Sequence, residues 1–105
     1  MNAFSKPLPL PDHVGTVTHR RLGKKNEYVD YHVKGTPIHF RAQKAGAKFV
    51  IVEYEKGRGG FMRIVATFDN ADSAAHQAHD MAMNKADTQE DQTLKRLINI
   101  LHKGE

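Results

Sequence analysis

The chain of 105 residues contains no cysteine. It can therefore form no disulfide, no thiolate metal site and no cysteine nucleophile. No stretch approaches the roughly 20 apolar residues that span a bilayer. Prolines 7, 9 and 11 interrupt the N-terminal segment, where a signal peptide would place its apolar run. We therefore expect a soluble, cytoplasmic protein that makes no contact with a membrane.

Sequence motifs of catalysis are also missing. There is no GxSxG, no GxxxxGK[ST], no HExxH and no carboxylate pair in a recognisable setting. The segment KGRGG, 56–60, joins two predicted strands, as a hairpin loop does. Among seven histidines, only His76 and His79 have helical spacing, beside Asp80, and a zinc site needs three or four converging ligands. We therefore predict a protein that is not an enzyme and has no catalytic residues, metal or cofactor.

Charge is distributed unevenly along the chain. Residues 1–63 carry 12 Lys and Arg against 5 acidic residues, whereas residues 64–105 carry 4 against 7, and the net charge of the whole chain is +4. A basic front half is typical of a surface for nucleic acid or another polyanion. The alternative is a solvated surface on which charge is merely uneven.

The N-terminal segment and the strands follow from local composition. Residues 1–12 are predicted to form an extended arm, because KPLPLP favours polyproline II and cannot form a helix interior. Residues 13–105 are predicted to form a single domain, which suits a chain of this length. Segments rich in alternating or β-branched residues predict strands over 14–22, 28–34, 38–43, 48–55 and 61–68.

Alternation with a period of two assigns side chains to the faces of these strands. In 28–34, Asp30 and its even-numbered neighbours are expected to point to one face, and the odd-numbered Val29, Tyr31 and Val33 to the other, as in a half-buried strand. In 38–43, Phe40 is expected to face the core and Arg41 to face outward. In 61–68, strict alternation predicts one face made of Met62, Ile64, Ala66 and Phe68, and another made of Phe61, Arg63, Val65 and Thr67.

Two helices are predicted after the strands. Asn70 is suited to cap the first helix, and alanines at helical spacing give that helix a narrow apolar face. Asp87 and Thr88 are capping candidates for a second helix. The second helix has apolar residues at i, i+3, i+4 and i+7, which could form a homodimer interface: Leu94, Leu97, Ile98 and Leu101.

These elements predict an α+β fold, in which an antiparallel sheet of four or five strands is followed by two C-terminal helices packed on one face. The other face is then open. A sheet face rich in Arg and Lys can enter a major groove or lie along phosphates, although such side chains also serve solubility. Glu53 and Glu55 would oppose an anion there. The predicted nucleic-acid-binding residues are Arg41, Lys44, Lys48, Lys56, Arg58 and Arg63.

The stretch ATFDNADSAAHQAHDMAM, 66–83, joins the last predicted strand to the first predicted helix. With the two strands before it, from about residue 38, it resembles the three-strand-plus-helix DNA-binding domain of plant ethylene-response factors. Related domains occur in phage homing endonucleases and as the arm-binding domain of tyrosine integrases. In that family a strand ending in GTFD leads into a helix with a YDEAA core, and the matching residues here are Thr67, Phe68, Asp69, Ala78, Asp80 and Ala82.

The sequence departs from this family at three of its motif positions. Ala66 replaces the glycine before the threonine, Phe49 replaces the tryptophan of the middle strand, and His79 replaces the tyrosine of the helix motif. The resemblance covers less than half of the chain. The resemblance implies that the protein binds duplex DNA. It also implies that three basic side chains face the groove: Arg41, Lys48 and Arg63.

The sequence therefore predicts a small, non-enzymatic nucleic-acid-binding protein that uses a basic sheet face, with duplex DNA as its partner. The alternative is a phage- or plasmid-type inhibitor or adaptor that acts on a host protein. Small size, the absence of cysteine and catalytic motifs, and an arm bearing Leu8 and Leu10 suit that alternative.

Overall fold

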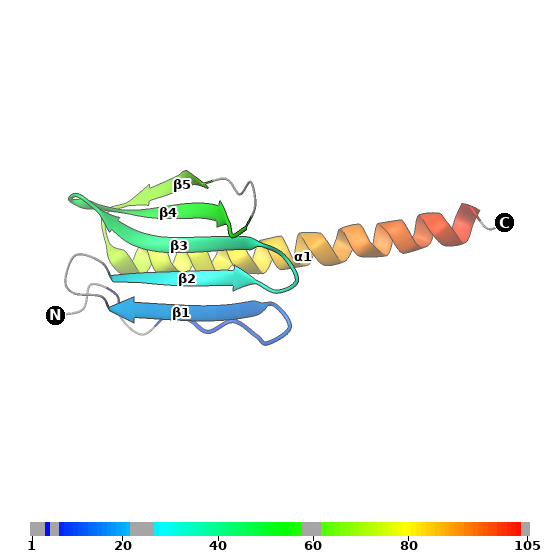
Figure 1. Ribbon diagram of the computed structural model, residues 1–105, viewed down its shortest axis with the longest axis horizontal. Helices are drawn as coiled ribbons and strands as arrows, with labels where there is room; N and C mark the ends of the chain where they lie inside the picture. The colour runs from blue at the N-terminus through cyan, green and yellow to red at the C-terminus, as the bar shows by residue number, and fades with distance from the viewer. Residues whose placement is uncertain (1–3, 5–6, 22–26, 58–61, 104–105) are drawn as a thin grey trace.

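The computed structural model shows a five-stranded antiparallel sheet followed by one long helix (Figure 1), which confirms the predicted α+β class. It describes residue 4 and residues 7–21, 27–57 and 62–103, and only the backbone of residue 21 and residues 89–103. Each strand pairs with its neighbour in sequence, in the order β1-β2-β3-β4-β5. The elements are β1 Gly15–Arg21, β2 Glu27–Val33, β3 Ile38–Ala45, β4 Lys48–Glu55, β5 Met62–Phe68 and α1 Ala71–Lys103.

The prediction of two C-terminal helices is wrong, because α1 is continuous over 33 residues. The helix contains neither glycine nor proline, so no residue in it breaks the hydrogen-bond pattern. Thr88, expected near a helix start, donates its hydroxyl to the carbonyl of Asn84 at 2.9 Å. This bond to the preceding turn is the pattern of a threonine inside a helix. Asn70 is a cap as predicted, since its Oδ1 accepts the N–H of Ser73 at 2.8 Å.

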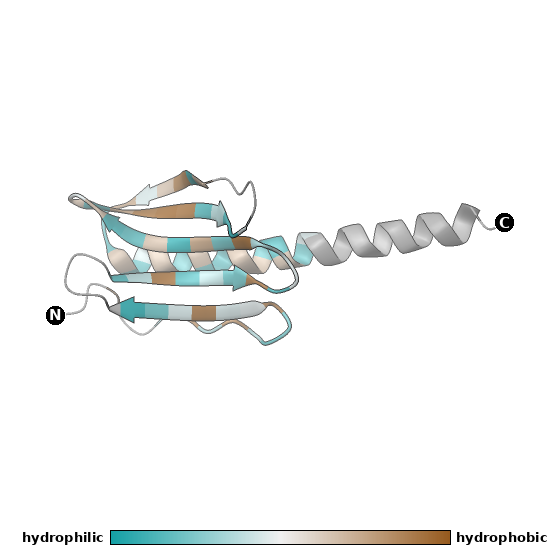
Figure 2. Cartoon of the chain, viewed as in Figure 1, coloured by the Kyte–Doolittle hydropathy of each residue, from teal (hydrophilic) through white to brown (hydrophobic). Residues whose placement is uncertain are grey.

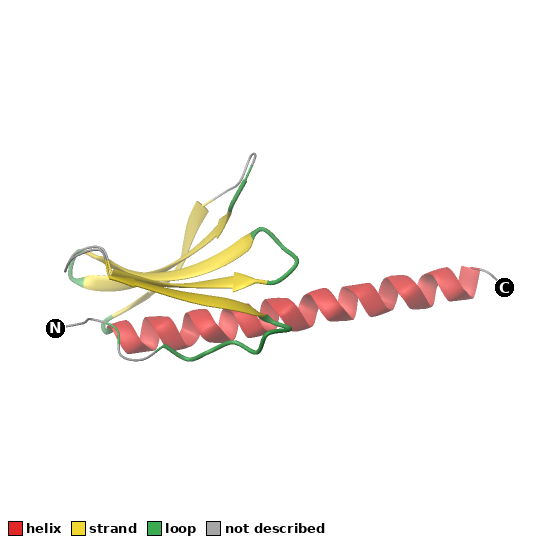
Figure 3. Cartoon of the chain, turned by 60° about the horizontal axis from the view of Figure 1, so that its bottom comes forward, coloured by secondary structure: helices red, strands yellow, loops and turns green. Residues whose placement is uncertain are grey.

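Short side chains let the first half of α1 lie close to the sheet. The predicted alanine face is buried, with Ala74, Ala78 and Ala82 fully so. It packs against apolar residues of β2, β3 and β4 in a single core. Hydrophobic and hydrophilic residues alternate along most of β3 (Figure 2). Figure 3 shows α1 against one face of the sheet, with its second half continuing past the strands.

The predicted alternation holds in β2 and β3 but fails in β5. Ile64 lies opposite Val52, whereas Ala66 lies opposite Ile51, so Val65 between them has no partner. This extra residue is a β-bulge, and it moves the residues before it to the other face of the sheet. The face away from α1 therefore carries Met62 and Ile64, and the helix side carries Ala66 and Phe68.

The N-terminal arm packs on the same side of the sheet as the helix (Figure 3). Phe4 is 2% exposed, and its ring meets those of His19 and Phe49 edge-on, with centroids 6.3 and 5.8 Å away. The hydroxyl of Tyr31 donates to the carbonyl of Leu8 at 3.2 Å. The arm thus completes the core where the helix does not reach.

A leucine in the alanine face should push α1 away from the sheet. We expect Ala78→Leu to lower the free energy of unfolding by about 1–3 kcal/mol, because the site holds no space for three more carbons. Urea denaturation followed by circular dichroism measures this. The matched control is Gln77→Leu at an exposed position next to it, which should change stability by less than about 0.5 kcal/mol. Equal effects of the two changes would contradict the close packing of α1.

The tyrosine in the core should make stability fall at high pH. Burial raises the pKa of Tyr31 to about 12 from an ordinary value of 10.0. Between these values the folded state keeps a proton that the unfolded chain loses, so the free energy of unfolding falls by up to about 1.4 kcal/mol per pH unit. In the Tyr31→Phe variant, the free energy of unfolding should not show this fall between about pH 10 and pH 12. Urea denaturation curves taken at several pH values across that range measure it. The two proteins should run parallel below about pH 9, and parallel curves above that pH would refute the assignment.

Candidate functional site

The face of the sheet away from α1, termed the open face, carries three rows of side chains that cross the strands. Residues directly opposite each other on antiparallel strands share a face. The strand register therefore gives the rows. They are Thr16, His32, His39, Tyr54 and Met62; Thr18, Asp30, Arg41, Val52 and Ile64; and Arg20, Tyr28, Gln43, Val50 and Thr67.

Asp30 is at the centre of a hydrogen-bonded cluster on this face. Its side chain is only 8% exposed. The carboxylate lies 2.6 Å from Nδ1 of His39 and accepts the hydroxyl of Tyr54 at 2.6 Å. It also accepts a hydrogen bond from Nε–H of Arg41 at 3.3 Å. A carboxylate this buried needs such partners, so Asp30 fixes the positions of its three neighbours.

Arg41 is held down on the sheet by contacts with three residues. Besides its bond to Asp30, it donates Nη2 to the hydroxyl of Tyr54 at 2.9 Å. Its guanidinium carbon lies 3.9 Å from the centroid of the Tyr28 ring. This is a cation–π contact in addition to a charge pair. Arg41 keeps 30% of its side chain exposed, and it presents a flat cationic surface rather than an extended side chain.

Three rings of the first row stack on one another. His32 and His39 have centroids 4.4 Å apart, and His39 and Tyr54 have centroids 4.8 Å apart, with 16° between planes in both pairs. Nε2 of His32 lies 2.8 Å from the carbonyl oxygen of Thr36. Burial, and then the hydrogen bond to Asp30, raise the pKa of Tyr54 above its ordinary value, so the phenol stays a donor.

A hollow of about 220 Å³ lies over this cluster, and its lining extends the cluster to β1 and to the end of β4. Threonines 16 and 18 contribute short hydroxyl side chains there. The three cations that line the hollow outnumber its one carboxylate: Arg20, Arg41 and Lys56 against Asp30.

The six residues predicted to bind nucleic acid do not lie on one face. Arg41 and Lys56 line the hollow. Alternation along β4 places Lys48 on the open face as well. Lys48 forms an exposed ion pair with Asp69, and that hydrogen bond lowers the pKa of Asp69. Lys44 alternates with Ala42 of the core and is exposed on the helix side.

The β-bulge moves Arg63 to the helix side as well. Its Nε and Nη2 contact Oε1 of Glu53 at 2.9 and 2.8 Å. Glu53 and Glu55 alternate with Ile51 of the core, so neither acid lies on the open face. The acids that were expected to oppose an anion are thus behind the sheet. Arg58 lies outside the described residues.

Reasoning from the sequence missed most of this cluster. Arg20 and the rings of Tyr28, His32 and Tyr54 were not among the predicted site residues. A signal for them existed, because alternation already placed Asp30 with its even-numbered neighbours on one face. The missing step was the hairpin register, which sets Asp30 opposite Arg41 and His32 opposite His39.

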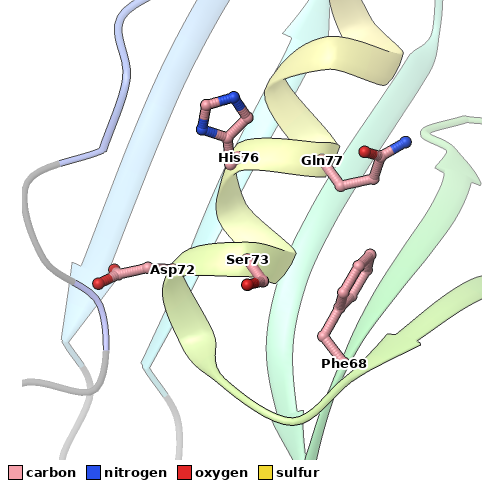
Figure 4. A pocket seen from close by; sticks show the side chains of 5 residues that line it. All are labelled: Phe68, Asp72, Ser73, His76 and Gln77. Carbon is pink, nitrogen blue, oxygen red and sulfur yellow. The ribbon is translucent and has the colours of Figure 1, made fainter.

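A second hollow, of about 420 Å³, lies at the start of α1 (Figure 4). In this view the side chains of Gln77 and Phe68 lie on one side of the helix, and those of Asp72 and His76 lie on the other. They do not converge on a point, as catalytic groups or ligands would. In the part of the chain that the structure describes, no group of three or more His, Asp or Glu is placed to hold a metal ion.

The two histidines of α1 differ in exposure. His76 is 65% exposed, but His79 is 18% exposed and packs edge-on against the ring of Tyr31 at 5.9 Å. His79 therefore contributes to the contact between helix and sheet.

Comparison of the chain with protein-family models, with curated proteins and with solved structures found no match. Among the described residues, no helix combines the length and the apolar character that crossing a membrane requires. The arrangement of the open face is therefore the main guide to function.

The cluster should depend on the charge of its central carboxylate. We expect Asp30→Asn to lower the free energy of unfolding by about 1–3 kcal/mol, because Arg41 and Tyr54 lose a charged acceptor. Urea denaturation at neutral pH measures the loss. Asp87→Asn, an exposed position on α1, is the control and should be nearly neutral. A stability unchanged by the substitution at Asp30 would show that the cluster does not tie the strands together.

Proposed function

We propose that this chain is a small, non-enzymatic nucleic-acid-binding protein whose open face lies against the phosphate backbone. The observation that carries the proposal is the excess of cations over carboxylates around the hollow on the open face. Cations and aromatic rings gather on the open face, while Glu53 and Glu55 lie behind it. Cations interleaved with rings suit a polyanion that also carries planar groups.

The proposal assigns different roles to the basic residues. Arg20 and Lys56 are exposed at the hollow and meet phosphates directly. Arg41 contributes a fixed positive surface at the centre. Lys48 is a peripheral contact, because an exposed ion pair such as that with Asp69 is weak and screened by salt. Arg58 remains a predicted contact of the connection between β4 and β5.

The ethylene-response-factor resemblance stays a prediction, as does duplex DNA as the partner that it implies. Of the three residues that it directs toward a groove, Arg63 is paired with Glu53 on the helix side. The proposal therefore relies on the cluster around the hollow and not on that resemblance.

Binding to a labelled oligonucleotide should weaken steeply as salt rises, because cations on the open face displace counterions. Arg20→Ala and Lys56→Ala should each reduce the slope of log affinity against log salt by about 1. Fluorescence anisotropy at several salt concentrations measures these slopes. Lys44→Ala removes an equal charge from the helix side and should leave the slope unchanged. A loss at Lys44 as large as that at Lys56 would place the interface elsewhere.

A second candidate function is that of a phage- or plasmid-type inhibitor or adaptor that binds a host protein. The observation that favours it is the continuation of α1 past the sheet (Figure 1). This part of the helix carries the apolar positions predicted to form a homodimer: Leu94, Leu97, Ile98 and Leu101. Light scattering reports the dimer, and a stoichiometric protein partner that survives nuclease treatment would favour this function over the first.

A further inference from the structure

We infer that the open face takes single-stranded nucleic acid, with one unstacked base seated over Thr16 against the ring of His32. The inference rests on the proposed function and names its substrate class. It follows from the state of Arg41, from the open end of the ring stack and from the positions of the flanking cations.

Arg41 is unsuited to reading a duplex groove. Groove reading needs side chains that extend from the protein to the edges of paired bases. Arg41, in the middle of the open face, is instead bound to Asp30 and Tyr54 and lies over Tyr28. Extending it would break its ion pair with the buried carboxylate of Asp30, which is unfavourable. The centre of the open face is therefore flat, and no arginine side chain extends from it toward the edges of paired bases.

The ring stack has an open end at β1. Its two centroid separations, 4.4 and 4.8 Å, match the spacing of neighbouring strands, about 4.8 Å. One ring thus stands over each of β2, β3 and β4. The next position at the same step lies over Thr16, which pairs with His32 and is short and exposed. A base placed there would continue the stack, and stacking on protein rings is how single strands are commonly held.

The hollow is small, as a seat for a single base would be. Its volume, about 220 Å³, is below the roughly 300–1,000 Å³ of pockets for drug-sized ligands. A base can enter it only when it is not paired. At this end the hollow is lined by Thr16, Thr18 and His32. The two threonines have short side chains that leave room for a base, and the imidazole ring of His32 lies beside that space.

The cations lie at both ends of the hollow. Arg20 stands in the third row, and Lys56 follows Tyr54 of the first row by two residues. They are six residues apart along the strand direction, roughly 20 Å, and three strands apart across the sheet, roughly 14 Å. Phosphates on both sides of the seated base would meet them, and this arrangement requires a polynucleotide and not a free nucleotide.

The test is anisotropy with three labelled probes of equal length: an oligo-dT, an oligo-rU and a blunt DNA duplex. We expect at least one single strand to bind roughly tenfold or more tighter than the duplex. Thr16→Phe fills the seat with the protein's own ring and should weaken single-strand binding roughly tenfold without changing its salt slope. Thr67→Phe adds the same ring to the same face on β5, outside the hollow, and should bind like the unchanged protein.

A second variant keeps the test valid if Thr16→Phe does not fold, as judged by circular dichroism. His32→Leu removes the ring but keeps an apolar side chain, and it should also weaken single-strand binding roughly tenfold. Unchanged binding by a folded variant at either position overturns the inference.

The probes separate the two claims. Duplex binding that equals or exceeds single-strand binding, with a steep salt slope, overturns the inference and leaves the proposed function standing. Salt-independent binding, or no binding, to all three probes overturns the proposed function and the inference with it.

Discussion

Five buried alanines on α1 determine which face of the sheet the protein presents to its surroundings: Ala71, Ala74, Ala75, Ala78 and Ala82. The alanine face of the helix lies against Val29, Tyr31 and Phe40, close enough that no second layer of side chains is needed between them. Because a strand alternates its residues between faces, covering one set leaves the other set in the open. The polar positions of β1–β3 are exposed to ligand only because the helix and the arm both occupy the opposite side.

No described segment covers the open face, and its polar cluster supplies part of the order that packing supplies elsewhere. Asp30 joins residues of β3 and β4 to β2 through three hydrogen bonds. Among the described buried side chains, every polar atom has a hydrogen-bond partner. Such fully satisfied networks are rigid. The rings and the guanidinium of the site are thus preorganised, and a ligand need not order them on binding.

Local pattern was enough to predict the class, all five strands and the faces of β2 and β3. The prediction of faces failed in β5, where a single extra residue interrupts the alternation of side chains. Val65 looks like any other strand residue, and only the pairing with β4 shows that it is a bulge, so Arg63 was assigned to the wrong face. Thr88 has the side chain of a cap, but the absence of glycine and proline around it decided in favour of one helix. The cluster around Asp30 needed cross-strand register, which composition does not contain.

The contact made by Phe4 has a consequence for how the chain is assembled. A meander forms by successive hairpins, each between neighbours in sequence, and such local pairing is rapid. The first described residue is the exception, since its ring rests between β1 and β4. During synthesis this phenylalanine leaves the ribosome before any of the five strands, but its binding place is complete only once the fourth strand has emerged. The N-terminal arm must therefore close over a sheet that is already largely built, and its docking is a late step of folding.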